Sequence, residues 1–253
     1  MNPTGNTILI TGGGSGIGRG LAEALHRLGN TVIIAGRRQA VLDEVVTANP
    51  GMHALTLDVE SAEGVESFAA TVAERFPALN VLVNNAGIMR AENLLEPQSA
   101  LADAEAIVAT NLLGPIRLTA ALLPLLRKQP KATVMFVSSG LAFVPLALTP
   151  TYSATKAAIH AYSESMRYQL KNTPVEVLEL VPPYVQTELM GGAEDPRAMP
   201  LADFIQEAVG ILTGQPDAKE INVQRVHPLR YAERNGAYDA TFKGLNDAMA
   251  GGH

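Results

Sequence analysis

The chain of 253 residues contains no cysteine. This absence excludes disulfide bonds, thiol catalysis and zinc sites built on cysteine. The five histidines show no His-Glu-x-x-His pattern or other short ligand spacing, so we expect no metal site. Positive charge is also scarce, with 19 lysines and arginines against 25 acidic residues and a net charge of −6. A surface that follows phosphates needs the opposite balance, so we expect no nucleic-acid partner.

The sequence lacks an uninterrupted apolar run of the length that a membrane-spanning helix needs. The most apolar stretch, 112–126, is interrupted by Pro115, Arg117 and Pro124. The amino terminus has no basic segment followed by an apolar one, which is the pattern of a secretion signal. With 47% hydrophobic and 17% charged residues, the composition is that of an ordinary globular protein. We therefore expect a cytoplasmic protein with no membrane partner.

Short apolar runs rich in β-branched residues alternate with longer stretches of helical pattern. This alternation is typical of parallel βαβ units. The predicted strands are 6–11, 31–35, 53–58, 80–84, 132–138, 175–181 and 220–224. The predicted helices are 17–28, 39–48, 62–75, 99–127 with an interruption, 152–172 and 201–212. Together they predict an α/β fold with one doubly wound, seven-stranded parallel sheet and helices on both faces.

No repeat, linker or low-complexity tract interrupts this rhythm, so we expect residues 1–253 to form a single domain. One stretch, 184–200, is irregular and contains Gly191-Gly192 and Glu194-Asp195-Pro196, residue types that are common in loops. It follows the sixth predicted strand and precedes a helix. We therefore expect a mobile lid there.

A glycine-rich turn, Thr11-Gly12-Gly13-Gly14-Ser15-Gly16-Ile17-Gly18, follows the first predicted strand and opens the first predicted helix. Glycines let the backbone approach a pyrophosphate, and the amino terminus of the helix stabilises its charge. The spacing is not the usual G-x-G-x-x-G, because Gly12 and Gly16 are separated by three residues. The turn predicts a dinucleotide site, with a purely structural turn as the alternative.

The end of the second predicted strand indicates which dinucleotide binds. An acidic side chain at that place binds a free ribose 2′-hydroxyl, whereas an arginine accommodates a 2′-phosphate. The sequence there is Ala35-Gly36-Arg37-Arg38, with no acid. Two guanidinium groups can form charge-assisted hydrogen bonds to a phosphate, so we predict NADP(H) as the cofactor. The alternative is a solvated pair of charges at the start of a helix.

Tyr152 and Lys156 are four residues apart in a predicted helix, so their side chains share one face. An ammonium group beside a phenol favours the ionised phenol. We therefore expect Lys156 to lower the pKa of Tyr152 from its ordinary value near 10, so that the tyrosine can donate and accept a proton near neutral pH.

Further motifs accompany this pair in a fixed order. They are Thr-Gly-x-x-x-Gly-x-Gly at 11–18, Asp58-Val59, Asn84-Asn85-Ala86-Gly87, Asn111, Ser138-Ser139-Gly140, Tyr152-x-x-x-Lys156, and Pro182 with Thr187. Each is modest alone, but their order and spacing together are very specific. On these motifs the chain resembles the short-chain dehydrogenase/reductase family over nearly its whole length. The resemblance implies a single-domain Rossmann-type fold that transfers hydride between a nicotinamide and a carbonyl or alcohol.

The resemblance also implies roles for a catalytic set. Tyr152 is the general acid that protonates the carbonyl oxygen, and the base in reverse, while Lys156 stabilises the phenolate and holds the nicotinamide ribose. Ser139 hydrogen-bonds the substrate oxygen, and we prefer it to Ser138 because its spacing to Tyr152 matches similar sequences. Asn111 holds a water molecule that links Lys156 to solvent. Taken singly, each residue also has an ordinary structural explanation, in a helix face, a strand-end cap or a buried hydrogen bond.

The predicted cofactor contacts follow from the same resemblance together with the two arginines. They are Gly12, Ser15, Gly16, Ile17, Gly18, Arg37, Arg38, Asp58, Val59, Asn85, Ala86, Gly87, Tyr152, Lys156, Pro182, Val185 and Thr187. Two positions depart from the family pattern. Pro183 stands where relatives commonly have glycine, which stiffens the start of the irregular stretch and removes a backbone donor. Ser15 stands where many NADP-dependent relatives have a basic residue, so phosphate recognition would depend more on the two arginines.

The substrate is indicated only by the residues that would line its pocket. In this family the pocket is built from residues after Gly87, residues after Ser139 and the 184–200 stretch, and these are mostly apolar here. We predict a hydrophobic ketone or aldehyde as substrate, or the corresponding alcohol, with simple packing under the lid as the alternative. The strings at 80–85 and 220–223 look similar to a branch of uncharacterised oxidoreductases associated with a D-alanylation operon.

The predicted helices 99–127 and 152–172 carry more apolar residues than one sheet face needs. Similar enzymes pair these helices, so we expect a homodimer or homotetramer. The leading interpretation is an NADPH-dependent carbonyl reductase or alcohol dehydrogenase. A β-ketoacyl reductase is the nearest rival, although an acidic carrier protein would need a basic docking patch. A nicotinamide-sensing regulator without turnover is the rival from another class.

Overall fold

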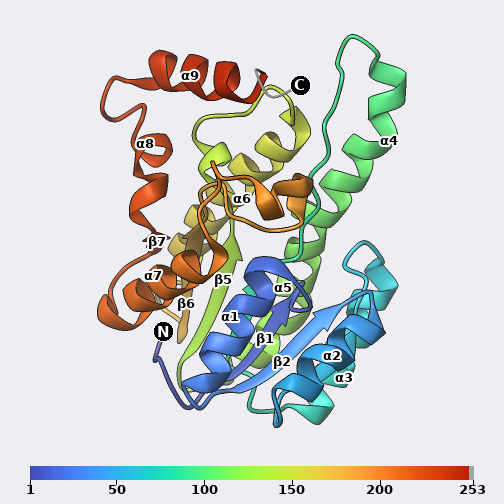
Figure 1. Cartoon of the computed structure of the whole chain (residues 1–253). Coiled ribbons are helices and arrows are strands. Elements are labelled where there is room, and N and C mark those ends of the chain that lie inside the picture. Colours follow the sequence, from blue (N-terminus) through green and yellow to red (C-terminus); the bar gives the residue numbers. More distant parts are fainter. Residues whose placement is uncertain (251–253) are drawn as a thin grey trace.

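The computed structural model describes residues 1–250, without the side chains of residues 97–100, 192, 193 and 250. It contains one sheet of seven parallel strands in the order β3-β2-β1-β4-β5-β6-β7 (Figure 1). The strands are β1 (Thr7–Thr11), β2 (Thr31–Gly36), β3 (His53–Thr56), β4 (Val81–Asn84), β5 (Ala132–Val137), β6 (Val175–Val181) and β7 (Glu220–Asn222). The predicted doubly wound α/β fold is confirmed.

The strand β1 lies inside the sheet, between β2 and β4. Its residues Ile8, Leu9 and Ile10 are fully buried, as expected for a parallel strand that is covered on both faces. The strand order reverses at this point, since β2 follows β1 on one side and β4 lies on the other. Such a reversal leaves a crevice outside the carboxyl ends of the two strands.

Helices cover both faces of the sheet. One apolar cluster joins a face to α1 (Gly16–Arg27), α2 (Gln39–Ala48) and α7 (Leu201–Gly214). A second cluster joins the other face to α3 (Ala62–Arg75), α5 (Gly114–Leu126) and α6 (Pro150–Gln169). The helix α4 (Pro97–Val108) continues through a π-helical segment, Ala109–Leu113, into α5. Figure 1 shows α4 reaching beyond the sheet as an arm.

The predicted elements differ from the observed ones at several ends, most at α6, which was predicted as 152–172 and ends at Gln169. The predicted strand 53–58 ends at Thr56, and the predicted strand 220–224 ends at Asn222. The residues just beyond a strand end leave the sheet and are free to line the crevice. Two further helices, α8 (His227–Arg230) and α9 (Tyr238–Ala250), follow β7 and were not predicted.

The continuous helix Leu101–Leu126 is long and apolar enough to cross a membrane by length and composition alone. The sequence prediction that no stretch reaches that length is therefore wrong in this respect. Pro115 comes just after the π-helical segment Ala109–Leu113, where the regular hydrogen-bond pattern is already altered, and the helix continues past it. The inner residues Leu118, Leu122 and Leu126 are buried in the cluster under the sheet, which is how a core helix of a globular protein behaves.

The irregular stretch 184–200 forms a loop over the carboxyl ends of the strands. It closes on itself through a single bridge between Val185 and Met199, and its backbone reaches a positive φ of 55° at Met190. The helix α9 is tied to this loop by Arg197, which donates to the carbonyl oxygen of Ala248 at 2.9 Å. Asn246 of α9 also accepts a hydrogen bond from the N–H of Ala147 at 2.6 Å. A lid at 184–200 stays a prediction, as does the single domain.

We expect the core under α5 to govern the stability of the fold. Replacing Leu122, which is 1% exposed, by alanine leaves a cavity and should lower the free energy of unfolding by about 2–5 kcal/mol. Leu95 is 92% exposed, so Leu95→Ala should change it by less than about 0.5 kcal/mol. Urea titration followed by circular dichroism measures both. Equal losses in the two variants would contradict this account of the core.

Candidate active site

The glycine-rich turn between β1 and α1 is held in a conformation that only glycine adopts easily. Gly12 and Gly16 have φ values of 66° and 51°. A Cβ on Gly18 would overlap the carbonyl oxygen of Gly12, so the turn and the first helical residues touch backbone to backbone. The N-terminus of α1 therefore opens directly onto the crevice, where it can stabilise an anion.

A hydrogen-bonded clamp joins the ends of β1 and β4 beside this turn. The Thr11 hydroxyl accepts from the N–H groups of Asn85 and Ala86, each at 3.0 Å. The Asn85 amide donates to the carbonyl oxygen of Thr11 at 2.9 Å. These bonds fix the two strand ends relative to each other and so set the width of the crevice. Sequence reasoning noted Thr11 within its motif but did not assign it this role.

One cavity of about 260 Å³ lies at the end of β2. Arg37, Arg38, Asp58 and Val59 line it, and their contact with the adenosine side of a dinucleotide stays a prediction. Arg37 lies 3.7 Å from the carboxylate of Glu60, an ion pair that the sequence analysis missed. That carboxylate also accepts from the Thr110 hydroxyl at 2.6 Å, so it is fixed in place and orients the guanidinium.

A second cavity of about 460 Å³ lies over the carboxyl ends of β4, β5 and β6. It contains Ser139, Tyr152 and Lys156, together with the predicted contacts Pro182, Val185 and Thr187. Gly12, Ser15, Ala86 and Gly87 line both cavities. The two cavities are therefore parts of one elongated crevice, whose shape suits an extended dinucleotide with its pyrophosphate at the N-terminus of α1.

Two of the predicted site residues do not line the crevice. Gly18 lies beneath the turn, against Gly12 and Asn85. Asn111 lies in the π-helical segment, a distortion that often marks functional sites. Its amide accepts from the N–H of Ile88 at 2.9 Å and donates to the carbonyl oxygen of Ile88 at 2.8 Å. In the structure Asn111 is therefore a buried residue that fixes the loop after β4 through two hydrogen bonds. Its role in holding a water molecule stays a prediction.

The phenol of Tyr152 is buried beside Ser139. Burial raises its pKa to about 12, and the hydrogen bond with the Ser139 hydroxyl lowers it by less. The pKa of Tyr152 is therefore raised and not lowered as predicted, because burial outweighs the effect of the neighbouring polar groups. The Lys156 ammonium lies over the tyrosine ring, 5.4 Å from its centroid, and donates to the carbonyl oxygen of Val137 at 2.8 Å. At neutral pH, Tyr152 is therefore held in its protonated form.

Lys156 is also buried, with 5% of its surface exposed. Burial lowers its pKa to about 8, while the negative charge of Glu179 opposes this change. Lys156 is therefore mainly protonated at neutral pH, but its pKa lies only about one unit above neutrality. The carboxylate of Glu179 was not singled out in the sequence.

The two neighbouring serines point to different partners. Ser138 donates to the Glu179 carboxylate at 2.5 Å. Ser139 accepts from the N–H of Leu141 at 3.1 Å and forms the hydrogen bond with Tyr152. The geometry therefore agrees with the choice of Ser139 as the serine beside the phenol, because the hydroxyl of Ser138 is engaged elsewhere.

Residues 6–198 match the family model described as short chain dehydrogenase. The chain belongs to the short-chain dehydrogenase family. It is 41% identical over 249 residues to an uncharacterized oxidoreductase of Bacillus subtilis (strain 168) named DltE, covering 97% of this chain and 98% of that protein. These matches show an oxidoreductase of this family with a nicotinamide dinucleotide site.

Solved structures agree with this family and its fold. A short chain dehydrogenase from Burkholderia cenocepacia J2315 in complex with NADP has a TM-score of 0.79 and 26% identity, covering 97% of this chain and 99% of that one. A short chain dehydrogenase/reductase from Burkholderia phymatum in complex with NAD has a TM-score of 0.80 and 20% identity, covering 93% of this chain and 95% of that one. The latter likeness shows the fold alone.

The contact between Gly12 and Gly18 provides a direct test of the crevice. We expect Gly18→Ala to lower the free energy of unfolding by about 1–3 kcal/mol, because its Cβ would force the turn apart, and to weaken nucleotide binding. Gly210, in α7, offers a matched control, since a Cβ there meets no described atom within 4 Å. Gly210→Ala should stabilise the helix by up to about 1 kcal/mol. Urea titration measures the stability of both variants, and NADPH fluorescence measures their nucleotide binding. Unchanged NADPH binding in Gly18→Ala would contradict the assignment of the glycine-rich turn to the nucleotide site.

Proposed function

We propose that the protein is an NADPH-dependent carbonyl reductase or alcohol dehydrogenase that acts on hydrophobic ketones or aldehydes. The observation that supports this most strongly is the shared cavity of Ser139, Tyr152 and Lys156 at the end of a crevice that begins at the arginines after β2. We also propose a cytoplasmic location, with catalysis and cofactor binding in a single domain.

The reaction needs a hydride, which a bound reduced nicotinamide supplies. The buried hydroxyl of Tyr152 holds a proton at neutral pH and is placed to give it to a carbonyl oxygen in the cavity. Ser139 is hydrogen-bonded to that hydroxyl and can orient the same oxygen. Lys156 supplies a positive charge below the ring, which stabilises the phenolate that remains after proton transfer.

The walls of the larger cavity favour an apolar substrate. Apolar side chains come from the loop after β4, the loop after β5, the 184–200 stretch and the two C-terminal helices; they include Met89, Leu141, Leu146, Leu148, Leu189, Met190, Leu229, Leu245 and Met249. The charged pair Asp195 and Arg197 also lines it, with two nitrogens of the guanidinium bound to the carboxylate at 2.7–3.1 Å. Because these two charges satisfy each other, the choice of substrate is left to the apolar walls and to Glu188, which also lines the cavity.

Arg37 and Arg38 support NADPH over NADH. They line the cavity at the end of β2, and the Arg37 side chain is 60% exposed, so it can turn toward a phosphate. Glu60 competes for the same guanidinium. A 2′-phosphate carries more charge than one carboxylate, so we expect it to win that competition.

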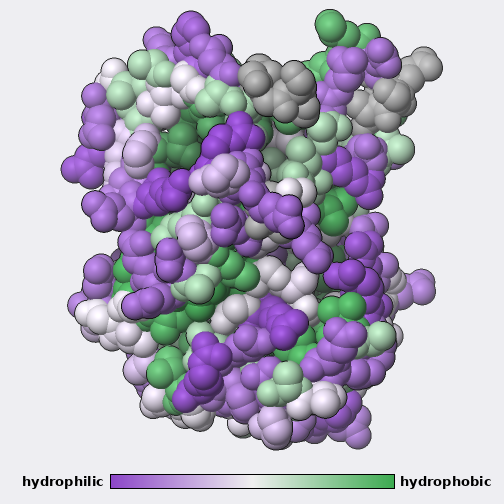
Figure 2. Space-filling model, viewed as in Figure 1, coloured by the Kyte–Doolittle hydropathy of each residue, from purple (hydrophilic) through white to green (hydrophobic). Residues whose placement is uncertain are grey.

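The β-ketoacyl reductase remains the second candidate, on the same catalytic residues. A carrier protein would need a basic docking patch, which an acidic chain of net charge −6 does not favour. A homodimer or homotetramer fits the exposed apolar residues in and around the α4 arm, which are Leu94 and Leu95 before the helix, Leu101 in it and Leu113 at the end of the π-helical segment. Figure 2 shows hydrophobic surface at the outer tip of this arm.

Tyr152→Phe tests the proposed acid. We expect kcat for NADPH-dependent reduction of apolar ketones to fall by about 10²- to 10⁴-fold, with NADPH binding retained, because only the hydroxyl is lost. Tyr168→Phe is the matched control, since Tyr168 lies on the same helix beside Lys171 but is 71% exposed. Undiminished turnover in Tyr152→Phe would remove the tyrosine from the mechanism.

Arg37→Asp tests the cofactor. Each charge-assisted hydrogen bond contributes about 1.5–3 kcal/mol, so we expect the Kd for NADPH to rise by about 10- to 100-fold, while the Kd for NADH falls. Arg234→Asp, which makes the same charge change at an exposed position, serves as the control and should alter neither dissociation constant. Fluorescence titration measures both constants. Tighter NADH than NADPH binding in the unmodified protein would contradict the proposed preference.

A further inference from the structure

The strand β6 carries a fully buried carboxylate beneath the catalytic helix α6. Val175, Val177 and Glu179 are alternate residues of β6, and the two valines belong to the apolar cluster that α5 and α6 cover. The exposed fraction of Glu179 is 0%, where another apolar side chain would continue the row. Removing a carboxylate from water costs several kcal/mol unless its partners compensate for the loss.

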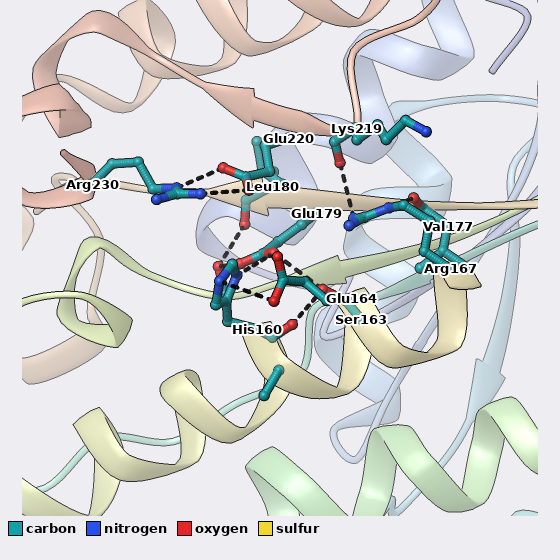
Figure 3. Close-up of polar contacts among 12 residues, drawn as sticks. His160, Ser163, Glu164, Arg167, Val177, Glu179, Leu180, Lys219, Glu220 and Arg230 are labelled. Carbon is teal, nitrogen blue, oxygen red and sulfur yellow. Dashed lines mark hydrogen bonds and ion pairs between the residues drawn. The ribbon is translucent and has the colours of Figure 1, made fainter. Parts of the chain in front are cut away.

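The partners of this carboxylate come from β5 and α6. It accepts from Ser138 at 2.5 Å on one oxygen. On the other it contacts the Ser163 hydroxyl at 3.1 Å and the Nδ1 atom of His160 at 2.8 Å. Figure 3 shows His160 and Ser163 pointing from α6 toward Glu179. Both carboxylate oxygens are therefore satisfied, and the group is fixed in one position.

The same contacts connect Glu179 to the catalytic set. Ser138 lies between Val137, whose carbonyl oxygen accepts from Lys156, and Ser139, which is hydrogen-bonded to Tyr152. Holding Ser138 thus holds both groups that orient the catalytic side chains. In addition, Tyr152, Lys156 and His160 follow one another at intervals of four residues, so they form one row on α6.

Besides Glu179 itself, charged groups of α6, β7 and α8 lie near this row. From α6 come Lys156, His160 and, 3.9 Å from the Nε2 atom of His160, the exposed Glu164. From β7 and α8 come Glu220 and Arg230, whose guanidinium binds the Glu220 carboxylate at 2.6 and 2.7 Å. The hydrogen bond to Glu179 raises the pKa of His160, and the negative charge of Glu179 raises that of Lys156 against the effect of burial.

The ligand atoms of His160, Glu179 and Glu220 lie within 4.8 Å of one another, as in a metal site. Sequence spacing did not reveal this group because its members come from α6, β6 and β7. The positive charge beside Glu220 is already supplied by Arg230, which also lies over the ring of Phe143 at 4.3 Å from its centroid. The cluster is therefore better explained as a charge network than as a place for a cation.

We propose that Glu179 is a positioning residue for the catalytic set: it anchors the segment from Val137 to Ser139 through Ser138, and it places a fixed negative charge against the row of α6 that carries Lys156 and His160. The proposal rests on the proposed function, because that function gives Lys156 and Ser139 their roles. The negative charge acts on Lys156 across the interior, while the hydrogen bond acts on the backbone around Ser138. These two effects are separable by mutation.

The deciding measurement is the pKa of Lys156 in protein without nucleotide, followed through the carbon chemical shift of its Cε atom. Glu179→Gln keeps the shape and one acceptor oxygen, so the hydrogen bond from Ser138 can remain, but it removes the charge. We therefore expect this pKa to fall by about one unit from its value of about 8. Glu176→Gln is the matched control, because Glu176 lies on the same strand and accepts from Thr133 of β5 at 2.8 Å, away from the crevice. An unchanged or raised Lys156 pKa in Glu179→Gln would overturn the proposal.

Ser138→Ala separates the effect of the Glu179 charge on Lys156 from the effect of its hydrogen bond on the segment from Val137 to Ser139. The carboxylate remains, so the pKa of Lys156 should stay within about 0.3 units, whereas kcat should fall about tenfold with an unchanged KM for NADPH. A shift of the Lys156 pKa as large as that in Glu179→Gln would show that geometry alone sets it, and would overturn the role of the charge. If Glu179→Gln does not fold, Glu179→Met removes the same charge and carries the same prediction.

Kinetics give an independent readout. Removing a negative charge favours deprotonation of Lys156 and of Tyr152 alike, so in Glu179→Gln the loss of reductase activity at high pH should begin at lower pH. The titration of Lys156 needs neither nucleotide nor substrate. A protein that reduces no ketone would therefore refute the proposed function while the chemical-shift result still decides whether Glu179 controls Lys156.

Discussion

The arrangement of the site depends on the packing of one helix face against the carboxyl ends of two strands. The face of α6 that carries Tyr152, Lys156 and Ile159 is buried against β5 and β6. Burial in this place raises the pKa of Tyr152 and lowers that of Lys156. The same contact that stabilises the fold therefore sets the protonation states of the crevice, and neither can change alone.

Local pattern determines most of the fold, and for this reason the sheet could be predicted. A strand buried on both faces is recognised by its continuous apolar run, and the helix periodicity between runs identifies parallel crossovers. The glycine-rich turn could be placed for a similar reason, since a helix that starts directly after a strand has few alternatives. The ends of β3 and β7 were predicted too long, because the pattern of the sequence continues for two residues past the last strand pairs, Gly36 with Thr56 and Val181 with Asn222.

The roles that could not be predicted from the sequence belong to residues whose partners lie in distant segments of the chain. Glu60, Glu179 and Arg230 are ordinary charged residues in the chain, and their meaning depends on Arg37, Ser138 and Glu220, which topology alone brings near them. The pKa of Tyr152 was predicted in the wrong direction for a related reason. Spacing on a helix reports a neighbouring charge but not the depth of burial, and here burial is the larger effect.

The attachment of α9 separates the shape of the cavity wall from the position of the Tyr152 side chain. Leu245 and Met249 form part of the wall around Tyr152, yet their helix is held by Asn246 and Arg197 rather than by the sheet. Under the proposed function, replacement of this terminal segment would therefore change the wall of the substrate cavity while Ser139, Tyr152 and Lys156 keep their places.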